Sequence, residues 1–232
     1  MSIDAATLAF ALGRSFLFVL AAILPILNPA ATAPVFLAMT EGADDATRAL
    51  LARRIARNMF VLMLGSMLVG SYVLDFFGIS LPIVRVGGGL IVAATAWRMV
   101  TATSETVATH TELAGAFTPE QAQRQAFYPL TFPISCGPGS IAAAITVGVW
   151  LHDASPGILL ARMAGAVAGL LVTGVVMYIA FRYARKMLKP LGEAGAIVFL
   201  RLSSFILLCI GVQIVWDGAS QLLREVLAAS QR

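Results

Sequence analysis

The chain has 232 residues, of which 59% are hydrophobic and only 12% are charged. A soluble domain carries about 25% charged residues, so this composition, with a mean hydropathy of +0.88, excludes an ordinary soluble protein and indicates an integral membrane protein. The net charge of +4 and the pI near 9.5 follow from basic loops and require no nucleic-acid partner.

Six apolar segments are predicted to cross the bilayer as helices. The runs 15–40, 125–151 and 163–181 carry no charged residue, and each has about 19 residues or more, which is enough to span. The other three segments are 58–74, 76–97 and 194–216, and the last two contain Arg85 and Arg201 respectively. The predicted fold class is all-α, an integral membrane protein with six transmembrane helices in a single domain, 1–232.

The distribution of Lys and Arg predicts the orientation in the membrane. Loops 77–80 and 151–157 carry no basic residue. The basic residues gather between the first two and the last two helices, at Arg48, Arg53, Arg54, Arg57, Arg182, Arg185, Lys186 and Lys189. The positive-inside rule places these loops in the cytoplasm and both termini outside the plasma membrane. No basic stretch precedes the first apolar run, so a cleaved signal peptide is not expected.

The two halves of the chain resemble each other. Residues 10–100 and 127–227 each hold three predicted helices, and a polar segment, 101–126, reads as a cytoplasmic linker. Arg85 and Arg201 both come early in their helices, and Pro25 and Pro133 are both followed by isoleucine. Three helices per half is an odd number, so the second half must enter the membrane inverted, as in many secondary transporters.

The first and fourth helices are predicted to be broken at mid-membrane, at Asn28–Pro29 and Gly137–Pro138. Because Asn is a preferred N-cap and proline is favoured at the first helical position, second half-helices are expected over 29–40 and 138–151. Their N-termini would present N–H groups to a carboxylate, and carbonyls freed by the prolines would accept from an ammonium group. Paired breaks indicate a transporter's binding site; the alternative is two packed helices that proline kinks.

The predicted substrate-binding residues lie at the two breaks and at the two membrane arginines. They are Asn28, Pro29, Thr32, Ser135, Gly137, Pro138, Gly139 and Ser140, together with Arg85 and Arg201. An arginine inside the bilayer costs about 2.5 kcal/mol or more, so these two are expected to face a cavity or a partner, unless they reach a nearby interface. The sequence allows three roles for Asp75 and Asp217: each could pair with an arginine, carry a coupling proton, or be a solvated carboxylate near a helix end.

Small residues predict close helix packing at two places. Glycines 87–89 lie in the third helix and are expected to approach another backbone, such as a broken helix. Ala161, Gly165, Gly169 and Thr173 lie at every fourth position of the fifth helix. Whether that face meets another helix or a second subunit of a homo-oligomer is open.

The sequence gives no sign of an enzyme. The two histidines, His110 and His152, lie in loops, and no Ser/His/Asp set or metal-ligand spacing accompanies them. Cys136 and Cys209 fall within membrane segments and are read as buried free thiols. No cofactor is therefore expected. Because no nucleotide-binding motif is present either, transport would be driven by an ion gradient.

The chain resembles the MarC family of integral membrane proteins, from its first predicted helix to its sixth. The residues that carry the resemblance are Asn28–Pro29 with 33–37, then 77–82 with 85–90, Pro129–Leu130 with 137–141, Arg201–Leu202, and 211–213. The resemblance implies six helices, a relation to the LysE-type exporters and, for some members, transport of small neutral amino acids such as glycine and alanine. Cys136 departs from the family pattern, which has a small residue such as alanine there.

The function expected is that of a secondary transporter of small neutral amino acids or similar zwitterions, with the proton as the expected coupling ion. A broad-specificity drug or metabolite exporter is the first alternative, and it predicts a roomier, aromatic-lined cavity. A lipid-headgroup translocator is another, and it should expose a basic pocket sideways to lipid. A non-transporting membrane scaffold would need no polar cavity at all.

Overall fold

The computed structural model describes residues 4–40, 42–101, 126–152 and 155–230. These residues are almost entirely helical, and no strand occurs among them. Five helices are long and apolar enough to cross a membrane, and a pair bent by 72° adds a sixth crossing if it counts as one span. The predicted linker, 101–126, lies outside the described residues except for its two ends.

The elements differ from the expected spans at two points. In chain order they are α1 (Ala5–Leu27), α2 (Pro29–Met39), α3 (Asp45–Phe76), α4 (Leu81–Thr101), η1 (Ala126–Ser135), α7 (Pro138–Leu151), α8 (Pro156–Arg182), α9 (Ala184–Leu188), η2 (Lys189–Leu191) and α10 (Gly192–Ser230). The first expected span, 15–40, is wrong, because α1 alone qualifies as a span and α2 is a separate short helix. Segment η1 is not regular helix, because Tyr128 and Phe132 have extended backbone.

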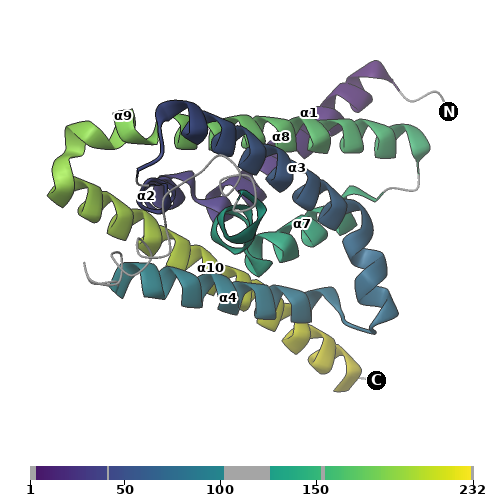
Figure 1. Cartoon of the computed structure of the whole chain (residues 1–232). Helices are drawn as coiled ribbons and strands as arrows, with labels where there is room; N and C mark the ends of the chain where they lie inside the picture. Colours follow the sequence, from purple (N-terminus) through teal and green to yellow (C-terminus); the bar gives the residue numbers. More distant parts are fainter. Residues whose placement is uncertain (1–3, 41, 102–125, 153–154, 231–232) are drawn as a thin grey trace.

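The long helices form two closely packed pairs, α1 with α8 and α4 with α10 (Figure 1). In the first pair, a Cβ at Gly165 would strike the Leu12 backbone, and one at Gly169 would lie 3.0 Å from the Phe16 carbonyl oxygen. The predicted close-packing face of the fifth span therefore meets another helix, α1. Helix α7 lies between the pairs, with contacts to α1, α3 and α4.

Two of the three glycines at 87–89 allow α4 to pack closely against neighbouring helices. A Cβ at Gly88 would lie 2.6 Å from the Ala142 side chain of α7, and one at Gly89 would lie 2.8 Å from the backbone nitrogen of Val215 in α10. Gly87 faces open space. The prediction of close backbone approach, including one against the helix that follows the second break, is confirmed.

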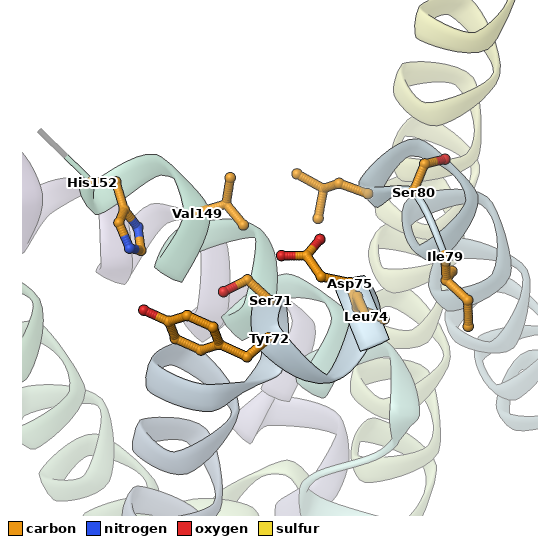
Figure 2. Close-up of a pocket in the computed structure, with 9 residues that line it drawn as sticks. Ser71, Tyr72, Leu74, Asp75, Ile79, Ser80, Val149 and His152 are labelled. Carbon is orange, nitrogen blue, oxygen red and sulfur yellow. The ribbon is translucent and has the colours of Figure 1, made fainter. Parts of the chain in front are cut away.

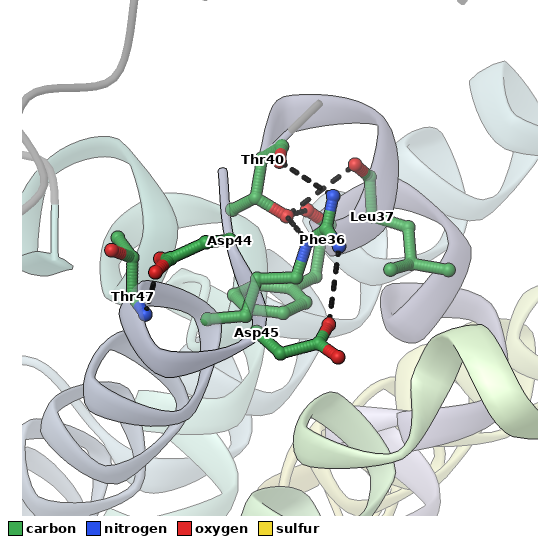
Figure 3. Close-up of polar contacts among 7 residues, drawn as sticks. Phe36, Leu37, Thr40, Asp44, Asp45 and Thr47 are labelled. Carbon is green, nitrogen blue, oxygen red and sulfur yellow. Dashed lines mark hydrogen bonds and ion pairs between the residues drawn. The ribbon is translucent and has the colours of Figure 1, made fainter. Parts of the chain in front are cut away.

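The basic residues expected in the first cytoplasmic loop lie in helix α3, whose first turn is joined to the end of α2 by hydrogen bonds (Figure 3). The Arg48 guanidinium donates to the Thr40 carbonyl oxygen at 3.0 Å, just past the C-terminal end of α2, and approaches Asp45 at 3.7 Å. A cation at this end of a helix also interacts favourably with the helix dipole. Asp44 caps α3 by accepting the Thr47 backbone N–H at 2.8 Å.

Acid should weaken the cap at Asp44. Hydrogen bonds from Thr47, through its side chain and its backbone N–H, hold the pKa of the Asp44 carboxyl below its ordinary value of 3.8. A lowered pKa means that the stabilisation is complete above the ordinary value and is lost as the pH falls through the lower one. At neutral pH the Tm of Asp44→Ala in detergent should lie below that of wild type, and this gap should narrow in acid, because the protonated carboxyl is a weaker acceptor. Asp44→Asn, which retains a neutral capping oxygen, is the control; a gap of unchanged size in acid would contradict the prediction.

Candidate functional site

Asn28 joins three parts of the protein at the first break. It has left-handed backbone (φ 45°, ψ 68°) between α1 and α2, a conformation that asparagine tolerates better than most residues. Its Oδ1 accepts the Ala31 N–H at 3.2 Å, which caps α2, and its Nδ2 donates to the Ser203 carbonyl oxygen of α10 at 2.9 Å. Helix α2 begins at the predicted position, Asn28–Pro29. The N-cap residue, Asn28, also links α2 to α10 by a hydrogen bond.

Replacing Asn28 should separate these effects. Asn28→Gly tolerates the left-handed backbone but loses both side-chain hydrogen bonds, to Ser203 and from Ala31, so a loss of about 1–2 kcal/mol is expected. Asn28→Ala loses the same two bonds and must also hold a positive φ, which adds about 1–2 kcal/mol. Thermal denaturation in detergent should rank wild type above the glycine variant and the alanine variant lowest. Asn58→Ala in α3 is the matched control, and equal Tm values for the two Asn28 variants would refute this account.

The second break is made of two wide turns that repeat a four-residue pattern. Residues 128–131 and 132–135 both read aromatic, proline, aliphatic, hydroxyl. The Thr131 hydroxyl donates to the Ala126 carbonyl oxygen and the Ser135 hydroxyl to that of Leu130, both at 2.6 Å. These hydroxyls satisfy carbonyls that a regular helix would pair with backbone N–H groups. Helix α7 then begins at Pro138, as predicted.

The polar groups predicted to bind substrate at the breaks are hydrogen-bonded within the protein. The Thr32 hydroxyl donates to the Asn28 carbonyl oxygen at 3.0 Å, and the Ser140 hydroxyl donates to that of Gly137 at 2.7 Å. Pro29 and Pro138 are the first residues of α2 and α7, while Gly137 is the N-cap of α7. Gly139 packs against Val92 and Gly88 of α4. These residues shape the breaks, and none of them lines either of the two pockets described below.

The cavity that combines opposite charges lies between α1, α4, α7 and α10. Its volume is about 420 Å³, within the range of small-molecule sites. Apolar side chains make up most of its wall, and Arg85, Asp217 and Thr146 provide the polar groups. The lining residues are Phe18, Ala21, Ala22, Ile26, Arg85, Ala142, Ala143, Thr146, Val147, Ile210, Ile214 and Asp217.

The two charges of this cavity are held by neutral amides. Arg85 Nη1 donates to Gln221 Oε1 at 2.9 Å, and Gln213 Nε2 donates to Asp217 Oδ1 at 2.8 Å. No ion pair joins Arg85 to Asp217 in the described part of the chain. A guanidinium has five N–H donors, so the single bond to Gln221 leaves most of them for a ligand. Asp217 likewise keeps acceptor capacity on its second oxygen.

One end of the cavity is closed by packed side chains. Ile26, which lines the cavity, packs against a cluster of Val92, Ala96 and Leu207 from α4 and α10. Asn28 follows Ile26 by two residues, and its bond to Ser203 crosses from the break to α10. Arg85 precedes Val92 by seven residues on α4, and Asp217 follows Leu207 by ten residues on α10.

Arg201 lies apart from this cavity. It is exposed on α10, twenty residues before the Gln221 that holds Arg85, a helical rise of roughly 30 Å. The structure therefore does not bring the two predicted arginines together. Burial of both arginines inside the bundle would argue against a lipid-headgroup translocator. Arg201 is exposed, so this argument against the translocator does not apply.

The sequence contains a signal for the missed residues. Gln213, Asp217 and Gln221 recur at every fourth position, so they lie on one face of a helix. Polar groups on one face of an apolar span usually point inward to a cavity or a partner. Of these three residues, only Asp217 is among the candidates named above from the sequence.

A second pocket, of about 360 Å³, lies where α3 ends beside the C-terminal end of α7 (Figure 2). Asp75, Ser71 and Tyr72 of α3 and Ser80 of the following turn line it, together with His152. His152 is held through Nδ1 by the Gly148 carbonyl oxygen at 3.1 Å. Within the described residues no group of His, Cys, Asp or Glu could hold a metal ion.

The helices and their apolar spans define a multi-pass integral membrane protein. A family model described as MarC family integral membrane protein matches residues 13–223, so the chain belongs to the MarC family. The inner membrane proteins MarC of Escherichia coli (strain K12) and of Shigella flexneri are each 27% identical to it over 207 residues, which cover 88% of this chain and 94% of each relative. No solved structure matches the chain.

Proposed function

We propose that this protein is a secondary transporter of small neutral amino acids or similar zwitterions in the bacterial inner membrane. The observation that carries the proposal is the cavity wall in which Arg85 and Asp217 stand unpaired with each other among apolar side chains. In this site Arg85 binds the substrate carboxylate and Asp217 binds its ammonium group.

The mostly apolar wall of the cavity favours a zwitterion. An ion that lies against such a wall loses part of its hydration and is stabilised by an opposite charge with good hydrogen bonds. Arg85 and Asp217 each have a neutral glutamine as partner, which provides a hydrogen bond but no countercharge. A zwitterion supplies both countercharges at once, and the guanidinium can hold a carboxylate through two parallel hydrogen bonds.

The size and lining of the cavity favour a small substrate over a bulky drug. Phe18 is the one aromatic side chain among the residues that line it. Ala142, Ala143 and Ala22 contribute only methyl groups. A broad-specificity exporter would need a wider cavity with more aromatic surface, so this arrangement supports the amino-acid proposal over that alternative.

The helix contacts support two inverted repeats with breaks at matching places. In the first half α1 packs on α8, and in the second half η1 and α7 pack on α3. In the same way, α2 packs on α10 and α7 packs on α4. Each of these contacts has a counterpart when the two halves are exchanged. Both termini lie on the side of Figure 1 opposite α9 and the basic residues near it. With the positive-inside rule, we place the termini outside the cytoplasm.

Counterflow in liposomes tests the proposal. Purified protein should exchange labelled glycine, alanine and serine in a saturable manner, while empty liposomes show only leakage. Glycine should compete, whereas glycinamide, which lacks the carboxylate, and acetate, which lacks the ammonium group, should compete at least about tenfold more weakly, since each leaves one charge unpaired.

The same assay separates the alternatives. Exchange of lipophilic drugs without exchange of amino acids would replace the proposal with drug export. Movement of labelled lipid headgroups between leaflets would favour a lipid translocator, to which the exposed Arg201 would be relevant. A folded protein that moves none of these would support a scaffold.

A further inference from the structure

The segment that joins α8 to α10, residues 182–191, is strongly basic, and we call it the α9 turn (Figure 1). It carries Arg182, Arg185, Lys186 and Lys189, while no acidic residue occurs between positions 154 and 192. In the part of the chain that the structure describes, no ion pair reaches any of these four side chains. Like charges so close together repel one another. The α9 turn therefore presents positive charge that an anion would neutralise.

The α9 turn is held firmly on the helix bundle. Ala184 is fully buried, and Phe181, just before the turn, stacks on Phe36 of α2 with 4.8 Å between the ring centroids. Two of the charges are also placed by one ring: the Arg182 guanidinium carbon lies 5.7 Å, and the Lys186 ammonium nitrogen 5.8 Å, from the centroid of Tyr183. Such distances allow a cation–π attraction. The cations thus lie on a fixed support.

Apolar side chains are exposed among these charges. Tyr183, Met187 and Leu191 follow one another at every fourth position and are 43%, 59% and 43% exposed. Basic residues mixed with exposed apolar side chains are typical of segments that lie in the membrane interface. There the apolar groups contact the acyl chains, while Lys and Arg meet the lipid headgroups.

The α9 turn also lies at the level of the headgroups. Helix α8 qualifies as a span and ends at Arg182, and the span of α10 begins at Ile197. The 27 residues of α8 extend over about 40 Å at 1.5 Å per residue, whereas the hydrocarbon core is about 30 Å thick. The end of α8 and the turn that follows it therefore reach the layer that contains the lipid phosphates.

We propose that the α9 turn binds an anionic phospholipid, with the lipid phosphate among the four cations and the acyl chains against Met187 and Leu191. A zwitterionic lipid brings an ammonium group that these cations repel, and soluble phosphate brings no acyl chain to cover the apolar side chains. The site goes beyond the proposed function and is independent of the substrate, since none of its residues lines the charged cavity.

Lipid titration of the purified full-length protein tests this site. The protein in a nonionic detergent is titrated with phosphatidylglycerol and with phosphatidylcholine of the same acyl chains, and the bound lipids are resolved by native mass spectrometry. Phosphatidylglycerol should bind at least about tenfold more tightly, and its affinity should fall as salt is added, because exposed charges are screened.

A double variant removes two of the charges. Arg185→Gln with Lys186→Gln should weaken phosphatidylglycerol about 25-fold, close to fivefold for each basic residue lost near a membrane surface. Its affinity for phosphatidylcholine should stay within about twofold. Arg98→Gln with Arg224→Gln is the matched control, because it removes two exposed cations that lie outside the α9 turn. This control should bind both lipids as wild type does.

Three results would overturn the proposal. They are equal affinity of wild type for the two lipids, wild-type affinity for phosphatidylglycerol in the variant at 185 and 186, and displacement of phosphatidylglycerol by an equal concentration of glycerol phosphate. The last result would show a site for a soluble anion. The first and third results use wild type alone, so they decide the question even if the double variant does not fold.

Discussion

Replacing Arg85 with methionine should reduce glycine exchange by about 100-fold in kcat/KM, since a hydrogen bond to a charged group contributes up to about 3 kcal/mol. Methionine is similar in length, so the cavity stays filled while the carboxylate loses its cation. Arg85→Lys should recover part of the activity, because lysine restores a charge but not the planar pair of donors. Initial rates of counterflow over a range of glycine concentrations would provide the measurement.

Two other arginines provide the comparison. Arg98 is an exposed residue of the same helix, α4, and Arg98→Met should leave exchange within a factor of about two, as expected for a surface change. Arg201→Met should resemble Arg98→Met if the cavity is the site. A loss with Arg201→Met as large as with Arg85→Met would instead favour the originally predicted pathway that includes both arginines.

Adding a methyl group at Gly148 should destabilise the fold more than at other glycines of the bundle. The new Cβ would strike the Met67 carbonyl group of α3, and a backbone cannot move aside as a side chain can. Overpacking of this kind costs about 1–3 kcal/mol. That loss corresponds to a fall in Tm of roughly 2–10 °C for a chain of this size, measurable by thermal denaturation in detergent.

Gly87→Ala is the matched control. No atom lies within 4 Å of a Cβ placed at Gly87, and alanine is favoured over glycine inside a helix by about 0.5–1 kcal/mol. Its Tm should equal or exceed that of wild type. If both variants lost stability equally, the close approach of α7 to α3 would not be the cause.

The sequence predicted the parts of the fold that depend on local chemistry. Runs without charge identified most of the spans, and the Asn28–Pro29 and Gly137–Pro138 pairs predicted where α2 and α7 begin, because capping depends on neighbouring residues. The start of α1 was wrong because Arg14 was taken as its limit, whereas the structure continues the helix to Ala5. Regular helix was expected across η1 because the run 125–151 carries no charged residue.

The candidate site was less predictable, because it depends on contacts between distant segments. Arg85 lines the cavity, but its partner Gln221 lies in another helix and could not be predicted from the residues around Arg85. Asn28, Thr32, Ser135 and Ser140 carry groups that suit a ligand, yet the same groups also suit the local backbone. Sequence alone does not distinguish those two uses, while the hydrogen bonds of the folded chain do.

The two glycine-lined helix pairs have a mechanical consequence. Helices whose backbones are in contact move together as a rigid body, so the α1–α8 pair and the α4–α10 pair should each tilt as a unit. A change of the cavity from one side of the membrane to the other should then occur by rocking of one pair against the other. Ile26 meets Leu207 and its neighbours between the two pairs. A disulfide between Ile26→Cys and Leu207→Cys would join the two pairs and should stop transport, and reduction of the disulfide should restore it. A disulfide between two helices of the same pair should leave transport unchanged.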